Sequence, residues 1–288
     1  MIYRLDQLAK IKYGKNQRKV EDPNGEFPIF GTGGLMGHSR EPLYSKPSVL
    51  IGRKGTIDKV RFVTKPFWTV DTLFYTEINE SLVLPYYFYC LLQTVDLAQL
   101  NEGTTIPSLR TETLNRLEFN IPDIATQKRI ASILSAIDEK IETNIKLINN
   151  LHTIGKAMYL HLVDGAPVER LSSLIDVVET GSRPKGGAVD NGYPSIGAEK
   201  IERFGIFEYQ SCKYISREFF HKLRRGIVKS GDVLIYKDGA YTGKSSMALN
   251  GFPYKLCAVN EHVFIARTKD SKYQSFLYFS IANERLLI

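Results

Sequence analysis

The stretch PIFGTGGLMGHS, residues 28–39, contains four glycines within seven positions, at 31, 33, 34 and 37. Backbone amides in such a glycine-rich loop can cradle a phosphate, so the stretch raises the question of nucleotide chemistry. A dinucleotide loop with the spacing GxGxxG from Gly31 would need glycine where Met36 stands. The pattern therefore favours tight turns, or a close approach of the backbone to a ligand.

A second stretch, GAYTGKSS at residues 239–246, resembles a Walker phosphate loop. That loop needs four residues between its glycines, whereas only Ala240, Tyr241 and Thr242 separate them here. The following MALNGFP is too short and too broken for the helix whose N-terminus would bind the phosphate. Nucleotide binding is not expected.

Other catalytic and metal-binding motifs are also absent or do not fit the sequence. A nuclease motif forced from Pro122, Asp123 and Glu139 would leave its lysine out of register, and no Asn/Asp-Pro-Pro-Tyr motif for base methylation is present. The five histidines form no HxH or HExxH pair, and the three cysteines form no CxxC pair. The sequence predicts a protein without an active site, metal or cofactor of its own. Turnover by the isolated chain would instead indicate an unrecognised enzyme.

The overall composition is that of a globular protein with a mild excess of positive charge. The chain has 288 residues, 43% of them hydrophobic, and a formal net charge of +7. A basic balance suits a polyanionic partner without establishing one. No window has the apolar length of a membrane span, and the start MIYRLDQLAKIKYGK lacks the apolar core of a signal peptide. We expect a cytoplasmic protein that does not bind membranes.

Residues 123–163 are predicted to form one long helix, because they contain one glycine and no proline. Asp123 or Thr126 can cap its start, and Gly165 with Pro167 can end it. About forty residues at 1.5 Å each span roughly 60 Å. Eight of ten positions at heptad spacing are apolar; the full series is Ile130, Leu134, Ile137, Ile141, Asn144, Ile148, Leu151, Gly155, Met158 and Leu162.

Such a seam needs a partner helix, because alone it would leave an apolar stripe in water. The length favours a coiled-coil spacer, and a core helix of a globular domain is the alternative.

The sequences on either side of this helix repeat each other. RLDQLAKI from Arg4 recurs as RLSSLIDV from Arg170, and GEFPIFG recurs as NGYPSIG, both at an offset of 166. VLIGRKG recurs as VLIYKDG at an offset of 184, and TVDTLFY as AVNEHVF at 189, which places insertions of 18 and 5 residues in the second copy. We therefore predict two copies of one α/β (α+β) domain separated by the long helix.

Each copy is expected to begin with a short amphipathic helix and to continue through strands such as SVLIG, KVRFV and TLFYTEI. A second helix should follow in each copy, in LPYYFYCLLQTVDLAQL from Leu84 and in SFLYFSIANERLLI at the chain end.

The junction GTTIPSLRTETLNRLEFNIPDIATQKRIASILSAIDEKI resembles the specificity (S) subunit of Type I restriction-modification systems. The features that carry the resemblance are Ile106–Pro107, the run from Leu109 to Pro122, Gln127, and the run from Ile130 to Ile141. The internal repeat, VLIGRKGTIDKV and PFWTVDTLFY add to it. The resemblance covers most of the chain.

The resemblance implies two target-recognition domains, at 1–122 and 165–288, with a spacer helix at 123–164. Each domain would read one half of a split site in double-stranded DNA. The helix would dock methyltransferase (M) subunits, and restriction (R) subunits would join them, so that S-adenosylmethionine and ATP belong to those partners. Family members normally carry a second long helix, which is not found before Ile288. Either the chain is C-terminally truncated or the missing helix comes from another chain, and the unpaired seam predicts self-association or a partner helix.

Polar and charged side chains read the base edges that are exposed in the DNA grooves, and basic side chains contact the phosphates. The candidates for DNA contact lie in the basic loops, in the glycine-rich turn and at the strand ends of both copies. They are Lys12, Lys15, Arg18, Lys19, His38, Arg40, Arg53, Lys54, Arg183, Lys185, Lys237, Tyr241 and Lys244. The loop KIKYGKNQRK holds the first four. The alternative function is a non-catalytic scaffold that binds proteins and oligomerises through its helix.

Overall fold

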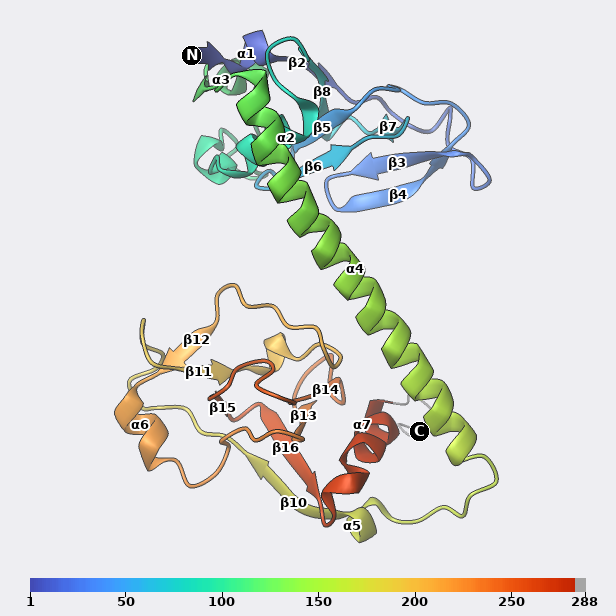
Figure 1. Ribbon diagram of the computed structural model, residues 1–288, viewed down its shortest axis with the longest axis vertical. Helices are drawn as coiled ribbons and strands as arrows, with labels where there is room; N and C mark the ends of the chain where they lie inside the picture. Colours follow the sequence, from blue (N-terminus) through green and yellow to red (C-terminus); the bar gives the residue numbers. More distant parts are fainter. Residues whose placement is uncertain (283–288) are drawn as a thin grey trace. The chain divides into compact units, whose positions relative to one another are not determined.

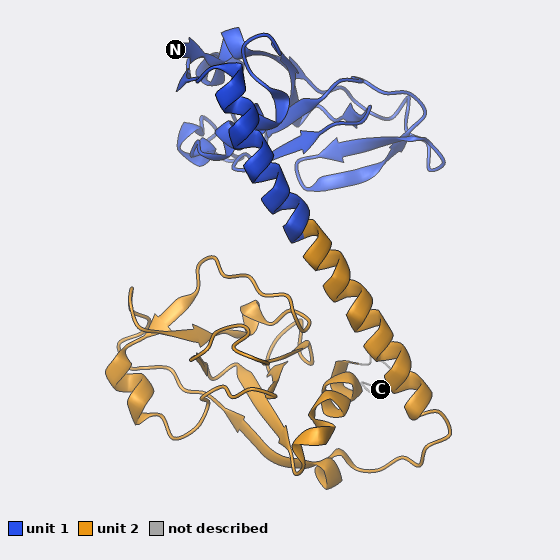
Figure 2. Ribbon diagram, viewed as in Figure 1, with its two compact units in different colours: residues 1–141 blue, residues 142–288 orange. Residues whose placement is uncertain are grey.

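The computed structural model describes residues 1–282 and is shown in Figure 1. Its contacts divide the chain into two compact units, Met1–Ile141 and Glu142–Ile288, coloured separately in Figure 2. The division falls inside one continuous helix, α4 (Ile124–Leu162). Each unit is therefore described with its own part of α4. The domain limits 1–122, 123–164 and 165–288 stay a prediction.

The first unit is built on a four-stranded sheet of order β2-β8-β5-β6, with a three-stranded sheet of order β4-β3-β7 and a small pair β1-β9. Antiparallel pairs dominate, and β3 runs parallel to β7. The elements before α4 are β1 (Ile2–Arg4), α1 (Leu5–Leu8), β2 (Ala9–Tyr13), β3 (Phe27–Gly31), β4 (Gly34–Ser39), β5 (Ser48–Gly52), β6 (Val60–Val63), β7 (Trp68–Thr69), β8 (Leu73–Ile78), α2 (Pro85–Gln93), the 3-10 turn η1 (Leu97–Leu100), α3 (Thr111–Asn115) and β9 (Glu118–Asn120).

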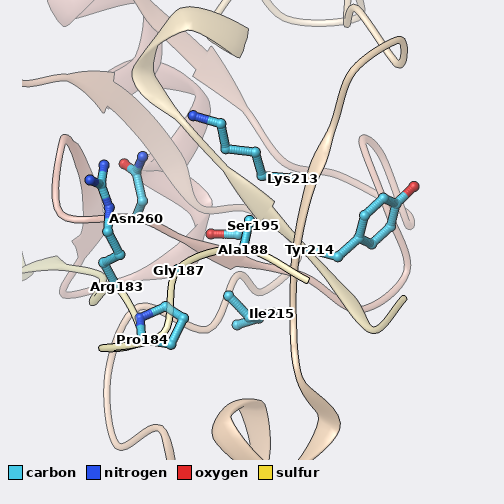
Figure 3. A pocket seen from close by; sticks show the side chains of 9 residues that line it. All are labelled: Arg183, Pro184, Gly187, Ala188, Ser195, Lys213, Tyr214, Ile215 and Asn260. Carbon is cyan, nitrogen blue, oxygen red and sulfur yellow. The ribbon is translucent and has the colours of Figure 1, made fainter. Parts of the chain in front are cut away.

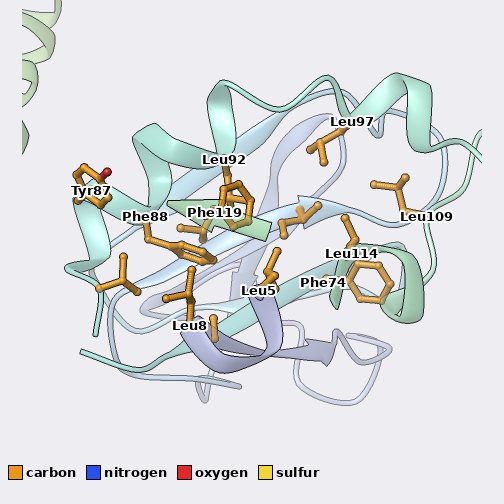
Figure 4. Close-up of a cluster of buried hydrophobic side chains, with 14 of the residues drawn as sticks. Leu5, Leu8, Phe74, Tyr87, Phe88, Leu92, Leu97, Leu109, Leu114 and Phe119 are labelled. Atoms are coloured by element: carbon orange, nitrogen blue, oxygen red, sulfur yellow. The ribbon is translucent and has the colours of Figure 1, made fainter. Parts of the chain in front are cut away.

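The main core of this unit lies between the four-stranded sheet and the helices α1, α2 and α3 (Figure 4). Leu5 and Leu8 from α1 and Phe88 and Leu92 from α2 are fully buried against Phe74 of β8. Burial of such side chains stabilises a fold by about 1.5–3 kcal/mol each.

The second unit repeats this plan. Its four-stranded sheet has the order β10-β16-β13-β14 and its three-stranded sheet the order β12-β11-β15, with β11 parallel to β15. The elements after α4 are α5 (Leu171–Leu174), β10 (Ile175–Thr180), β11 (Tyr193–Ile196), η2 (Ala198–Lys200), β12 (Lys213–Ile215), α6 (Arg217–Lys222), β13 (Val233–Tyr236), β14 (Ser245–Met247), β15 (Ala258–Val259), β16 (Val263–Thr268), η3 (Ser271–Tyr273) and α7 (Gln274–Ala282). The predicted repeat is confirmed at the level of topology.

One ion pair between corresponding strands has its positive and negative residues exchanged between the two copies. In the first unit Lys12 of β2 lies 3.8 Å from Glu77 of β8. In the second unit Glu179 of β10 accepts a 2.8 Å hydrogen bond from Arg267 of β16. The registers correspond, because β2 ends at Tyr13 opposite Phe74 and β10 ends at Thr180 opposite Phe264.

Helix α4 begins where the sequence predicts. The Asp123 carboxylate accepts hydrogen bonds from the Thr126 amide at 2.8 Å and from its hydroxyl at 3.1 Å, which makes Asp123 the cap. These bonds lower the pKa of Asp123. At the other end Gly165 has φ +68°, a left-handed conformation that stops a helix.

The first unit holds the start of α4 through Gln127, whose side chain is fully buried. Its amide donates to the carbonyls of Leu82 at 2.9 Å and Pro122 at 3.0 Å, and its oxygen accepts from the Leu84 amide at 2.9 Å. The glutamine noted in the sequence thus joins α2 to α4. About three turns further along α4 the Tyr86 hydroxyl donates to Asp138 at 2.6 Å.

An exposed apolar stripe runs along α4. Within the predicted seam, Ile130, Leu134 and Ile148 are half-buried. The exposed large apolar residues of α4 are Ile133, Ile137, Ile141, Ile145, Leu147, Leu151, Ile154, Met158 and Leu162. A continuous stripe of this kind is typical of a helix that associates with another element.

The second unit packs on α4 through α7. Gly155 lies directly under the Phe279 ring, and Tyr159 stacks on Phe279 and lies tilted against Phe276. The His152 ring lies 3.1 Å, Nε2 to hydroxyl oxygen, from Tyr278. Burial, followed by the charges of Arg203 and Lys156, lowers the pKa of His152 below its ordinary 6.5.

This lowered pKa predicts a loss of stability in mild acid. Below about pH 6.5 the unfolded chain binds a proton at His152 that the folded chain refuses, so the free energy of unfolding falls between pH 6.5 and the lower folded pKa. His152→Gln should flatten this dependence, measured as hydrogen exchange of α7 amides at pH 7.5 and 5.5. His161→Gln, an exposed position on the same helix, is the control; equal slopes in wild type and His152→Gln would contradict the assignment.

Two sequence predictions differ from the structure. The helix expected from Leu84 ends at Gln93 and continues as η1, because the β-branched Thr94 and Val95 interrupt it and Leu97 turns into the core. The basic stretch KIKYGKNQRK is strand β2 up to Tyr13 rather than a loop. The second closing helix is seen as α7 to Ala282, and its predicted residues 283–288 lie outside the described part.

Candidate nucleic-acid interface

One end of the first four-stranded sheet gathers basic side chains. Strand β5 ends beside the start of β8, so the amides of Arg53 and Lys54 donate to the Thr72 carbonyl at 2.9 and 3.2 Å. The Arg53 guanidinium donates to the Asp71 carbonyl at 2.8 Å and lies 5.1 Å from the centre of the Tyr13 ring. These contacts hold Arg53 rigidly while Lys54 remains exposed.

Lys15 joins the same end of the sheet. Its amide donates to Thr69 at 2.8 Å, and its carbonyl accepts from the Trp68 indole at 2.9 Å. The preceding Gly14 passes so close to the Val70 carbonyl that no side chain fits there. The structure therefore places three of the predicted residues, Lys15, Arg53 and Lys54, at the same end of the sheet.

The other predicted contacts of this unit lie elsewhere. Lys12 faces Glu77 on β8. Arg18, Lys19, His38 and Arg40 gather near the start of β3, where Arg40 donates to the Lys19 carbonyl at 2.9 Å and the His38 carbonyl accepts from Asp22. This second group is separated from Arg53 by the length of the β3–β4 hairpin, because Pro28 pairs with His38 and Gly31 with Gly34.

The corresponding end of the second sheet is also basic, but it carries carboxylates. Arg183 lies 2.9 Å from Glu261, and the Lys237 ammonium lies 3.4 Å from the Glu261 carbonyl. His262 bridges the carboxylates of Asp238 at 2.8 Å and Glu261 at 3.4 Å. Gly181 approaches the Val259 carbonyl as Gly14 approaches Val70. The two units therefore present the same backbone frame with different side chains.

The remaining predicted residues of the second unit lie in two loops. Lys244 pairs with Glu202 at 2.7 Å and lies 5.5 Å from the ring of Tyr241, which is exposed. The Walker-like stretch is a turn, and Ser245 begins strand β14 rather than a helix. Lys185 is exposed on the loop after Arg183.

A cavity of about 190 Å³ opens beside this end of the second sheet. Arg183 and Asn260 point their polar ends to the same side of it, while Tyr214 turns away (Figure 3). The Asn260 side-chain oxygen accepts a hydrogen bond from the His262 amide at 2.9 Å.

Sequence reasoning missed the acidic partners at this end. Glu261 and Glu202 form ion pairs with Arg183 and Lys244, and the Asp238 carboxylate lies against the His262 ring. One oxygen of Glu261 is buried without a hydrogen-bond partner among residues 1–282. The alignment of TVDTLFY with AVNEHVF contained the signal, because Glu261 and His262 stand where the first copy has Thr72 and Leu73.

Residues 1–282 contain neither a candidate metal site nor a candidate membrane-spanning helix. Among residues 1–282, no group of three or more histidine, cysteine, aspartate or glutamate side chains is placed to hold a metal ion. Within the same range, no helix has the length and apolar character needed to cross a membrane.

Comparisons with known proteins agree with this arrangement. The family model of the Type I restriction modification DNA specificity domain matches residues 1–153. The chain is 33% identical over 110 residues to the Type I restriction enzyme HindI specificity subunit of Haemophilus influenzae, covering 35% of this chain and 24% of that protein. It is 23% identical over 262 residues to the MjaIX specificity subunit of Methanocaldococcus jannaschii, covering 82% and 60%.

A solved structure has a similar fold. The S subunit of a Type I restriction-modification system from M. genitalium superposes with a TM-score of 0.62 at 17% identity, over 98% of this chain and 76% of that one. The family match extends over more than half of the sequence, through the first unit and most of α4. The chain therefore belongs to the family of Type I restriction modification DNA specificity domains.

Proposed function

We propose that this chain is the non-catalytic DNA-recognition subunit of a Type I restriction-modification complex, and that each unit reads one half of a bipartite site in double-stranded DNA. The observation that carries the proposal is the basic end of the four-stranded sheet, which recurs in both units on the same frame. Arg53 and Lys54 follow β5 in one unit, and Lys237 follows β13 in the other. Because the same backbone arrangement carries different side chains in the two units, the two domains are expected to read different DNA sequences.

Helix α4 would dock the methyltransferase subunits, with restriction subunits joining the complex. The exposed stripe that includes Ile137, Leu151 and Met158 supports this assignment, and self-association through the stripe is its alternative use. S-adenosylmethionine and ATP would be bound by those partners, and this chain would bind no cofactor. The complex would act in the cytoplasm.

Sequencing of modified bases tests the proposal in cells that express the chain with its methyltransferase subunit, with and without this gene. We expect methylated bases in a split motif that disappear when the gene is deleted. Purified complex should also bind that motif with an affinity that falls steeply as salt rises, because phosphate contacts release counterions. Salt-independent binding of protein partners with no change in methylation would favour the scaffold instead.

A further inference from the structure

The glycine-rich stretch of the first unit forms a β-hairpin whose tip exposes two apolar side chains. Strands β3 and β4 pair from Phe27 opposite Ser39 to Gly31 opposite Gly34. Leu35 and Met36 are 60% and 59% exposed. Neighbouring residues of a regular strand point to opposite faces, so one of the two would normally be covered.

An irregularity in the ladder explains why both are exposed. Phe30 pairs with Leu35 whereas Ile29 pairs with Gly37, so Met36 is the extra residue of a β-bulge. Bulges redirect a side chain and are frequent beside functional sites. Gly34 has φ +123°, and Met36 lies across the backbone of Gly31. The glycines therefore serve to expose this pair. In the second copy η2 follows β11 instead of a tight hairpin, and β12, the counterpart of β4, comes only later in the chain.

The tip lies within the basic surface rather than away from it. The Thr32 hydroxyl approaches within 3.8 Å of the place where a Gly55 side chain would begin, next to Lys54. The Arg61 guanidinium lies 5.6 Å from the centre of the Phe30 ring and 3.3 Å from the place of a Gly34 side chain. Among residues 1–282, no carboxylate forms an ion pair with Arg53, Lys54 or Arg61. An apolar tip framed by free cations is complementary to DNA, whose phosphates flank apolar thymine methyl groups.

We infer that the β3–β4 hairpin enters the major groove of the half-site read by the first unit, and that Leu35 and Met36 contact the 5-methyl group of a thymine. The inference rests on the proposed function and names the base feature that this unit reads. A two-stranded ribbon fits the width of the major groove, and apolar contact with this methyl group distinguishes thymine from the other bases. Arg61 and Lys54 would hold the flanking phosphates.

The test replaces each thymine of the half-site in turn by deoxyuridine, which removes only the methyl group. We expect at least one replacement to weaken binding by the wild-type complex about fourfold, the effect of losing one buried methyl-sized contact. The double variant Leu35→Ser, Met36→Ser should bind the thymine and uracil duplexes equally, with an unchanged salt dependence. Leu256→Ser, an exposed apolar residue of the second unit, is the matched control and should still discriminate.

Folding of the double variant can be checked with Trp68, the only tryptophan of the chain, because β7 belongs to the same sheet as the hairpin. Wild-type complex that binds every uracil duplex as tightly as thymine, or a half-site without any A·T pair, would overturn the inference. So would a double variant that keeps its discrimination and changes only its oligomeric state, which would assign the tip to a protein contact. Wild-type complex with no preference for the motif over scrambled DNA would instead refute the proposed function.

Discussion

Arg267→Met is expected to destabilise the second unit by about 3–5 kcal/mol, the loss typical when one partner of a buried ion pair is removed. The Arg267 side chain, 20% exposed, donates to both oxygens of Asp232 at 2.6 and 2.7 Å and to Glu179 at 2.8 Å. It also donates to the Ile227 carbonyl at 3.1 Å. The substitution would leave the Asp232 carboxylate, 3% exposed, buried without its cation.

The measurement is hydrogen exchange of the β13 and β16 amides, with Trp68 fluorescence as an independent report on the first unit. We expect the second unit to open at lower urea concentration while the Trp68 transition stays in place. Lys12→Met is the matched control, because its pair with Glu77 is 3.8 Å long and the lysine is 46% exposed, so its loss should cost at most about 1 kcal/mol. Adding Asp232→Asn and Glu179→Gln should recover part of the stability. Unchanged exchange in Arg267→Met would show that the network contributes no net stability.

Arg53→Ala should weaken binding of one half-site by about 10–100-fold and leave the other unaffected, as for an arginine that contacts a base edge. Arg53 is fixed by the Asp71 carbonyl and by the Tyr13 ring, so its remaining donors are held in one direction. Such preorganisation makes a single side chain count strongly in recognition.

Binding should be measured with two duplexes, each with one half-site intact and the other scrambled. Lys237→Ala is the matched variant, because Lys237 follows β13 as Arg53 follows β5, and it should affect the opposite duplex. A lower salt dependence of the variant would identify a phosphate contact rather than a base contact. Equal weakening of both duplexes by Arg53→Ala would contradict the assignment of one half-site to each unit.

The parts of the fold that the sequence predicts best are those governed by local patterns. Helix α4 was predicted over 123–163 and is found at Ile124–Leu162, because its periodicity persists and Asp123 can form its cap without help from the rest of the chain. The repeat could also be predicted from the sequence, because the similar segments VLIGRKG and VLIYKDG begin in the corresponding strands β5 and β13.

Features that depend on contacts between distant strands were not predictable. Nothing local indicates that Arg183 meets Glu261 or that Arg40 is used to hold the Lys19 carbonyl. The glycine-rich stretch favours tight turns or a close approach to a ligand, and a tight turn joins β3 to β4, yet the bulge at Met36 depends on the register of the two strands. Which basic residues contact DNA stays a prediction.

The reversed ion pair limits how segments of the two copies could be exchanged. Strand β2 placed in the second unit would bring Lys12 beside Arg267, and strand β10 placed in the first would bring Glu179 beside Glu77. Like charges in contact across a sheet are destabilising. A viable hybrid must therefore transfer β2 together with β8, residues 9–78, which also contain the hairpin, Lys15 and Arg53. New combinations of half-sites would then arise by transplanting about half of a unit, together with its DNA-contacting residues, rather than by exchanging single strands.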